Sequence, residues 1–155
     1  MNSGQRQVPL HKAVRGISGH ERRINCLIIL IEAGLRWLGL KRTEKILSFF
    51  TRKGHPPAPA AEAVLIDHYV LFFNERKERK KLKGKCLSQS LALRFLLLRK
   101  GIGSELRQGV ASGQGYLDAH AWLEKDGEVL NDHPSVISRY VVLPGHAVHK
   151  KTDFS

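Results

Sequence analysis

The chain has 155 residues, of which 42% are hydrophobic and 26% are charged, and its formal net charge is +12. This length and apolar content suit one domain with one hydrophobic core, or one domain with an extension, and exclude two full domains. The surplus of lysine and arginine favours acidic partners such as nucleic acid, anionic lipid or an acidic protein, although a solvated surface explains a charge run equally well.

The cysteine content indicates a reducing compartment. Cys26 and Cys86 are the two cysteines, too few for a disulfide framework or for a four-cysteine zinc site. Residues 1–23 do not resemble a signal peptide, and the apolar stretch 24–40 is too short and too charged for a membrane span. We therefore expect a cytoplasmic protein in which Cys86 is a free thiol, with surface association with a membrane as a minor alternative.

The first third of the chain is expected to be an appendage to the main domain. Residues 1–20 show no periodicity and are expected to be mobile. Residues 21–55 carry apolar side chains at steps of three and four, which predicts a helical extension. Gly34 and Gly39 interrupt this pattern, so two alternatives stay open for the segment: one long helix or two shorter ones. Three prolines within 56–59 then mark a linker.

The main domain is expected at residues 60–143, followed by a loose tail at 144–155. One helix begins after Pro59 and runs toward Lys80. The strongest helical pattern covers residues 86–100, where leucines form a stripe and a glycine follows in the position of a left-handed cap. Cys86 is therefore predicted to lie at the N-terminus of this helix.

After Gly103 the pattern changes to an alternation of apolar and polar residues, which predicts strands. A first strand covers 106–110, a second covers 116–124 and a third begins at 129 and reaches 132. Glycine-containing turns separate them.

The turn at 125–127 decides whether His120 and Asp132 can meet. A two-residue loop, Asp126-Gly127, in a regular hairpin would place Asp132 on the opposite sheet face from His120. A three-residue loop with Gly127 in the left-handed region would place the two residues directly opposite each other. We therefore predict the three-residue loop.

Cys86, His120 and Asp132 are of the residue types that nucleophilic catalysis requires. Unpaired N–H groups and peptide dipoles at a helix N-terminus favour the thiolate of Cys86. His120 would act as base and proton carrier, and Asp132 would orient it. Tyr116 and Trp122 share the sheet face of His120, and we assign them as substrate-binding residues. Each feature alone also has a structural explanation, since a helix-starting cysteine or a strand tryptophan is more often a core residue.

Several segments together resemble the lasso-peptide leader peptidases, the stand-alone transglutaminase-like subunits of split lasso systems. The resemblance covers roughly residues 62–143. It is carried by Cys86-Leu-Ser-Gln-Ser-Leu-Ala-Leu93, by Leu96-Leu-Leu-Arg-Lys-Gly-Ile102, by Ala119-His-Ala-Trp-Leu-Glu124 and by Leu130-Asn-Asp132.

This resemblance implies an α+β fold of the papain/transglutaminase type, with the helical extension at its N-terminus. It implies that Cys86 is the nucleophile, His120 the general base and acid, and Asp132 the residue that orients it. The implied reaction removes the leader from a ribosomal lasso-peptide precursor and needs no metal or other cofactor. The implied partners are that precursor, a small leader-binding recognition-element protein and a lasso cyclase that acts downstream, but no nucleic acid.

Three other interpretations stay open. The same triad could serve a transglutaminase-like acyltransferase or amidase. A basic module could bind nucleic acid or membrane through the run 76–85, although aromatic residues make up only 7% of the chain and do not interleave with that run. A zinc site of His120, Asp132 and His133 is weaker, because a hairpin histidine beside an aspartate is more often a hydrogen-bonded pair.

Overall fold

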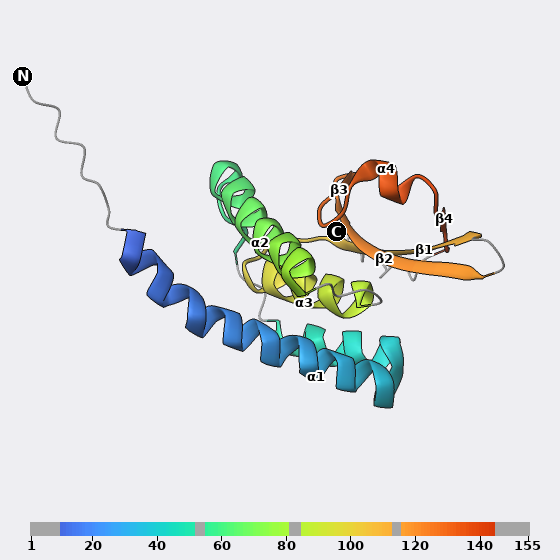
Figure 1. Cartoon of the computed structure of the whole chain (residues 1–155), viewed down its shortest axis with the longest axis horizontal. Helices are drawn as coiled ribbons and strands as arrows, with labels where there is room; N and C mark the ends of the chain where they lie inside the picture. The colour runs from blue at the N-terminus through green and yellow to red at the C-terminus, as the bar shows by residue number, and fades with distance from the viewer. Residues whose placement is uncertain (1–9, 52–54, 81–84, 113–115, 145–155) are drawn as a thin grey trace, which may run out of the picture.

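The computed structural model describes residues 10–51, 55–80, 85–112 and 116–144. Three long helices lie beside a four-stranded antiparallel sheet, so the predicted α+β class is confirmed (Figure 1). The elements in chain order are α1 (Leu10–Phe50), α2 (Pro59–Lys80), α3 (Cys86–Arg99), β1 (Glu105–Ser112), β2 (Leu117–Lys125), β3 (Glu128–Val129), α4 (Pro134–Ile137) and β4 (Val141–Val142).

Helix α1 is a helical hairpin. Gly39 has a φ of 75° and a ψ of 172°, a conformation that glycine adopts readily and that interrupts the helix. A first arm (10–38) and a second arm (40–50) therefore run back along each other, as the chain reversal at the end of α1 in Figure 1 shows. Of the two options that the sequence left open, the structure has two helices. Because α1 begins at Leu10, part of the segment 1–20, for which no regular structure was expected, is helical.

Helix α3 lies at the centre of the core. Leu91, Leu93 and Leu97 are at most 1% exposed, and they pack with buried isoleucines of α1 and with Tyr69 and Phe73 of α2. Complete burial of one such side chain contributes about 1.5–3 kcal/mol. The predicted helical extension therefore shares a single core with the main domain.

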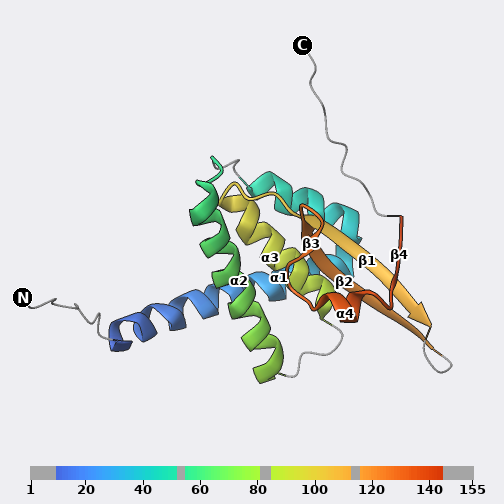
Figure 2. The ribbon, with the colours of Figure 1, turned by 90° about the horizontal axis from the view of Figure 1, so that it is seen from above.

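The sheet has the strand order β3-β2-β1-β4 (Figure 2). Leu123 of β2 points into the core against α3, and its neighbour Trp122 points to the opposite face. There Trp122 packs with Ile137 of α4 and with Tyr140, which precedes β4. Both faces of β2 are thus covered. Among the described helices, none has an apolar segment long enough to cross a membrane.

Candidate active site

The loop between β2 and β3 differs from the prediction. Lys125 pairs with Glu128, so the loop is Asp126-Gly127, with φ angles of 52° and 87°. A two-residue hairpin loop of type I′ requires positive φ at both positions, and an Asp-Gly sequence supplies them at low cost. The three-residue loop was therefore wrong. The third strand, predicted to reach residue 132, ends at Val129.

Asp132 nevertheless reaches His120, because the ladder stops early. The Leu130 N–H donates to the Leu123 carbonyl at 2.9 Å, and the ladder then ends. The side-chain oxygen of Asn131 accepts the Leu123 N–H at 2.8 Å, where a regular ladder would use a backbone carbonyl. The chain turns away from the strand direction, and Asp132 Oδ2 comes to lie 2.7 Å from His120 Nε2.

The early end of β3 also opens the edge of β2 to helix α3. Ser90 Oγ donates to the Ala121 carbonyl at 3.1 Å, and the Ala121 N–H donates to the sulfur of Cys86. Cys86 and Ser90 are four residues apart and therefore lie on one face of the helix. Asn131 Nδ2 donates to Ser90 Oγ at 2.9 Å. One face of α3 thus occupies the place of the missing strand, and this brings Cys86 to His120.

The environment of Cys86 lowers the pKa of its thiol. Partial burial opposes ionisation, but hydrogen bonds from His120 and from the backbone N–H groups of Ala121 and Leu87 outweigh it. Cys86 is the first residue of α3, and no side chain caps this helix end. The terminal N–H groups are therefore available to a negative charge.

His120 is positioned to carry a proton at neutral pH. Its hydrogen bond to Asp132 is the main cause that raises the pKa of His120 to about 9, with a further contribution from Cys86 and opposition from burial. Since Nε2 bonds to Asp132, Nδ1 is the ring nitrogen left for Cys86. Together with the lowered thiol pKa, this arrangement favours a thiolate–imidazolium pair.

Asp132 is held by three donors. Burial of its carboxyl group opposes ionisation, yet hydrogen bonds from His120, from the His133 N–H and from Lys77 hold the pKa of Asp132 well below its usual range. Lys77 Nζ lies 3.1 Å from Oδ2, the same oxygen that bonds to His120. Lys77 was not among the predicted site residues, because nothing in the sequence distinguishes it from its charged neighbours at the end of α2.

Two aromatic rings pack against the imidazole of His120 and against each other. Tyr140 stacks on it with ring centroids 5.2 Å apart, and Trp122 stacks at 6.1 Å. Tyr140 Oη also donates to Asp118 Oδ2 at 2.7 Å. Trp122 is fully buried, at 0% exposure, and therefore has no surface for a substrate. Its assignment as a substrate-binding residue does not fit this position, because the segment around Tyr140 covers it.

A cleft of about 850 Å³ opens over Cys86, His120 and Asp132. Tyr116, which is 67% exposed, lies in its lining, so its role in substrate binding stays a prediction. Helix α2 contributes Phe73, Lys77 and Glu78 to the walls, and the segment after α4 contributes Arg139 and Tyr140.

Of the three proposed zinc ligands, His120 and Asp132 meet, but His133 is engaged elsewhere. His133 Nδ1 lies 2.7 Å from Ser135 Oγ and caps α4. Within the residues that the structure describes, no three histidine, cysteine, aspartate or glutamate side chains are placed to hold a metal ion.

Comparison with protein families identifies the fold. The model of the transglutaminase-like superfamily matches residues 27–144. The chain belongs to the transglutaminase-like superfamily. The match runs from the first arm of α1 to the end of β4, so it includes Cys86, His120 and Asp132 and most of the predicted helical extension. Transglutaminase-like proteins are typically cysteine-dependent enzymes of the peptidase or acyltransferase type. Comparisons with curated proteins and with solved structures gave no match.

Proposed function

We propose that this transglutaminase-like protein is a cysteine peptidase that removes the leader from a ribosomal lasso-peptide precursor. The observation that carries the proposal is the contact of the Cys86 sulfur with His120, whose other ring nitrogen bonds to Asp132 in an open cleft. Superfamily membership supports cysteine-dependent acyl chemistry. The resemblance of the motifs around these residues to lasso leader peptidases supports the substrate class.

In the proposed reaction the Cys86 thiolate attacks the carbonyl carbon of the scissile amide. The His120 imidazolium gives its proton to the leaving amine as the C–N bond breaks, and a thioester forms between the leader and Cys86. Neutral His120 then takes a proton from water, and the hydroxide attacks the thioester. The C–S bond breaks and the leader leaves with a free carboxylate. The Cys86 backbone N–H is a candidate oxyanion donor, and loss of such a donor costs about a hundredfold or more in rate.

An acyltransferase or amidase is the alternative within the same superfamily. Its thioester would form in the same way but would be resolved by an amine instead of water, or would arise from a primary amide. The product masses separate these outcomes. A peptidase releases a leader with a C-terminal carboxylate, an acyltransferase leaves a new amide at that carbonyl, and an amidase leaves the precursor uncut with one primary amide converted to a carboxylate.

A basic nucleic-acid or membrane module has less support, because the basic side chains that the structure describes in the run 76–85 are engaged within the protein. Arg76 is 9% exposed and donates to the side-chain oxygen of Asn25. Lys77 bonds to Asp132, and Lys85 lies 3.0 Å from Glu32. We therefore propose protein and peptide partners: the precursor, the recognition-element protein and the downstream cyclase.

Mass spectrometry of a lasso precursor, incubated with its recognition-element protein and this chain, tests the proposal. The wild type should release the leader, and Cys86→Ala and His120→Ala should not. Cys26→Ala is the matched control, since Cys26 is the exposed cysteine outside the site. Full cleavage by both site variants would refute the proposal.

A further inference from the structure

The α1 hairpin carries a large apolar hollow. Its volume is about 890 Å³, and side chains of both arms of α1 and of the end of α3 line it. Trp37 is 83% exposed, Leu30 69% and Phe50 66%. Large apolar side chains that gather in an exposed concave patch are typical of binding surfaces. The hollow shares no residue with the cleft over Cys86.

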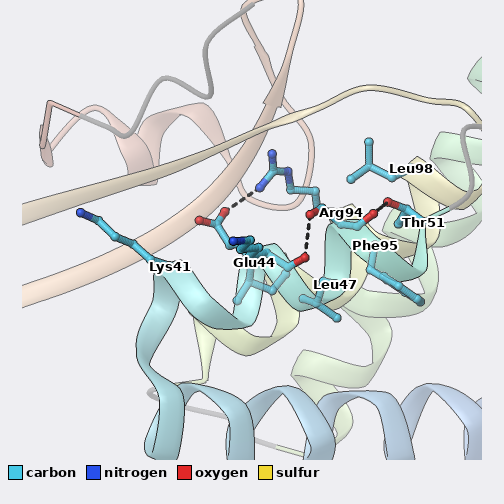
Figure 3. A pocket seen from close by; sticks show the side chains of 10 residues that line it. Lys41, Glu44, Leu47, Thr51, Arg94, Phe95 and Leu98 are labelled. Atoms are coloured by element: carbon cyan, nitrogen blue, oxygen red, sulfur yellow. Dashed lines mark hydrogen bonds and ion pairs between the residues drawn. The ribbon is translucent and has the colours of Figure 1, made fainter.

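The second arm is held firmly enough to form one wall of a groove. Glu44 forms an ion pair with Arg94 of α3, drawn as a dashed line in Figure 3, in which Oε1 lies 2.6 Å from NH1. A smaller hollow of about 430 Å³ lies on the other side of the arm. Figure 3 shows the side chains that line it. Leu47 and Phe95 line both hollows, so the second arm is a ridge between them. We call the larger hollow the α1 groove, with Leu30, Trp37, Leu38, Ile46 and Phe50 as its exposed apolar residues.

One cation lines this groove, and others are exposed on the two arms that form it. Arg99 of α3 lines the groove, and Arg36 and Arg42 are exposed on its two arms; none of the three forms an ion pair within the described part of the chain. Lys41 and Lys45 are also exposed, but they line the smaller hollow on the other side of the second arm. The neighbouring acidic residue Glu44 is already bonded to Arg94. An occupant that carries both apolar and acidic side chains therefore complements the groove.

Charge also argues against two other occupants. A second copy of the chain carries the same cations and a net charge of +12, so the two would repel each other. The chain's own segments 1–9, 52–54 and 145–155 contain a single acidic residue, Asp153, against five lysines and arginines. An anionic membrane would satisfy the charge, but a flat surface does not fill a hollow between two helices.

We propose that the α1 groove is a docking site for an acidic amphipathic helix of a partner protein. The apolar face of that helix would enter the groove at Leu30, Trp37 and Ile46, while its carboxylates would face Arg99 and the exposed cations of the two arms. Helix-in-groove recognition of this kind is a general mode of protein association. The proposal does not depend on the peptidase function, because groove and cleft are separate.

Tryptophan fluorescence of the full chain tests the proposal. The chain has two tryptophans, and Trp122 is fully buried, so a change on binding reports Trp37. The probe is a tryptophan-free synthetic peptide of about five helical turns, with leucines at helical spacing and glutamates elsewhere. We expect a saturable blue shift, and about tenfold weaker binding to the Leu30→Ser variant. The matched control is Leu71→Ser, which removes a leucine that is 61% exposed on α2 and should bind as the wild type does.

Other outcomes would overturn the proposal. The peptide could give no saturable shift, or the same peptide with lysines in place of glutamates could bind equally well. Binding unaffected by Leu30→Ser would place the peptide elsewhere. A larger shift with phosphatidylglycerol vesicles than with the peptide would identify a membrane surface. Sedimentation as a dimer that Leu30→Ser abolishes would identify a second copy as the occupant.

Discussion

Gly109 lies opposite His120 in the β1–β2 ladder, and the space above it is occupied. A Cβ atom at this position would be 2.8 Å from Cβ of Tyr140 and 3.0 and 3.1 Å from two ring atoms of Trp122. Neither neighbour can yield easily, since one contact is next to the backbone and the other is with a fully buried ring. We therefore expect Gly109→Ala to push Tyr140 away from the imidazole of His120.

The size of the effect follows from two opposing terms. Overpacking of a well-filled interior costs about 1–3 kcal/mol, whereas replacing glycine by alanine restricts the unfolded chain and returns about 0.4–1 kcal/mol. We expect a net loss of about 1–2 kcal/mol in the free energy of unfolding. The reactivity of Cys86 should fall about tenfold or more, because Tyr140 would no longer hold in place His120, the residue that bonds to Cys86.

Urea denaturation measures the first effect, and carboxymethylation of Cys86 by iodoacetate, followed by mass spectrometry in a Cys26→Ser background, measures the second. Gly103→Ala is the matched control, because a Cβ there would meet no atom within 4 Å. Its free energy of unfolding should change by less than about 0.5 kcal/mol. If Gly109→Ala behaved like Gly103→Ala in both assays, the packing argument would be wrong.

The same labelling assay tests the electrostatics. Iodoacetate reacts fastest with a thiolate beside an imidazolium, so the labelling rate should fall as the pH rises through the His120 pKa of about 9. We call this fall the alkaline limb of the pH profile. Asp132→Asn removes the main cause of that raised pKa, and the alkaline limb should move to lower pH; an unmoved limb would contradict this. Lys77→Met removes a cation that competes with His120 for the Asp132 carboxylate, so the limb should move to higher pH. The Lys77 side chain is 42% exposed, and such a pair is worth up to about 1 kcal/mol, which limits this shift to less than about one pH unit. A shift to lower pH in Lys77→Met would count against the competition.

The free energy of unfolding should depend on pH through His120 and Asp132 as well. A raised His120 pKa contributes stability that is complete below the pKa of the unfolded histidine and is lost as the pH rises through about 9. The lowered pKa of Asp132 contributes stability that is lost in acid. Both contributions are present together near neutral pH.

Local patterns predicted the elements that carry the site. The leucine stripe after Cys86 marked helix α3 and its start, and the alternation around His120 marked β2, because both patterns reflect burial on one face. The register of the β2–β3 hairpin was wrong because we assumed a regular strand as far as Asp132. The Asp-Gly loop and the side chain of Asn131 together end the ladder earlier, and the second of these is a tertiary contact that no periodicity reveals.

The supporting residues of the site could not be predicted, since they come from distant segments. Lys77 is 55 residues from Asp132 and meets it only because α2 packs across α3. Tyr140 covers Trp122 only because the chain returns along β1 after α4. The sheet face of Trp122 was predicted correctly, but its burial depends on that returning segment.

The hydrogen bonds of Ala121 determine how the reactive pair behaves when a substrate arrives. The N–H of Ala121 binds the sulfur of Cys86 and its carbonyl binds the hydroxyl of Ser90, so α3 cannot slide or rotate against β2 without breaking two bonds at once. The distance between sulfur and imidazole is therefore set by rigid backbone. An incoming peptide would meet a nucleophile and a proton donor already assembled, and no closing movement of these groups would have to precede the attack.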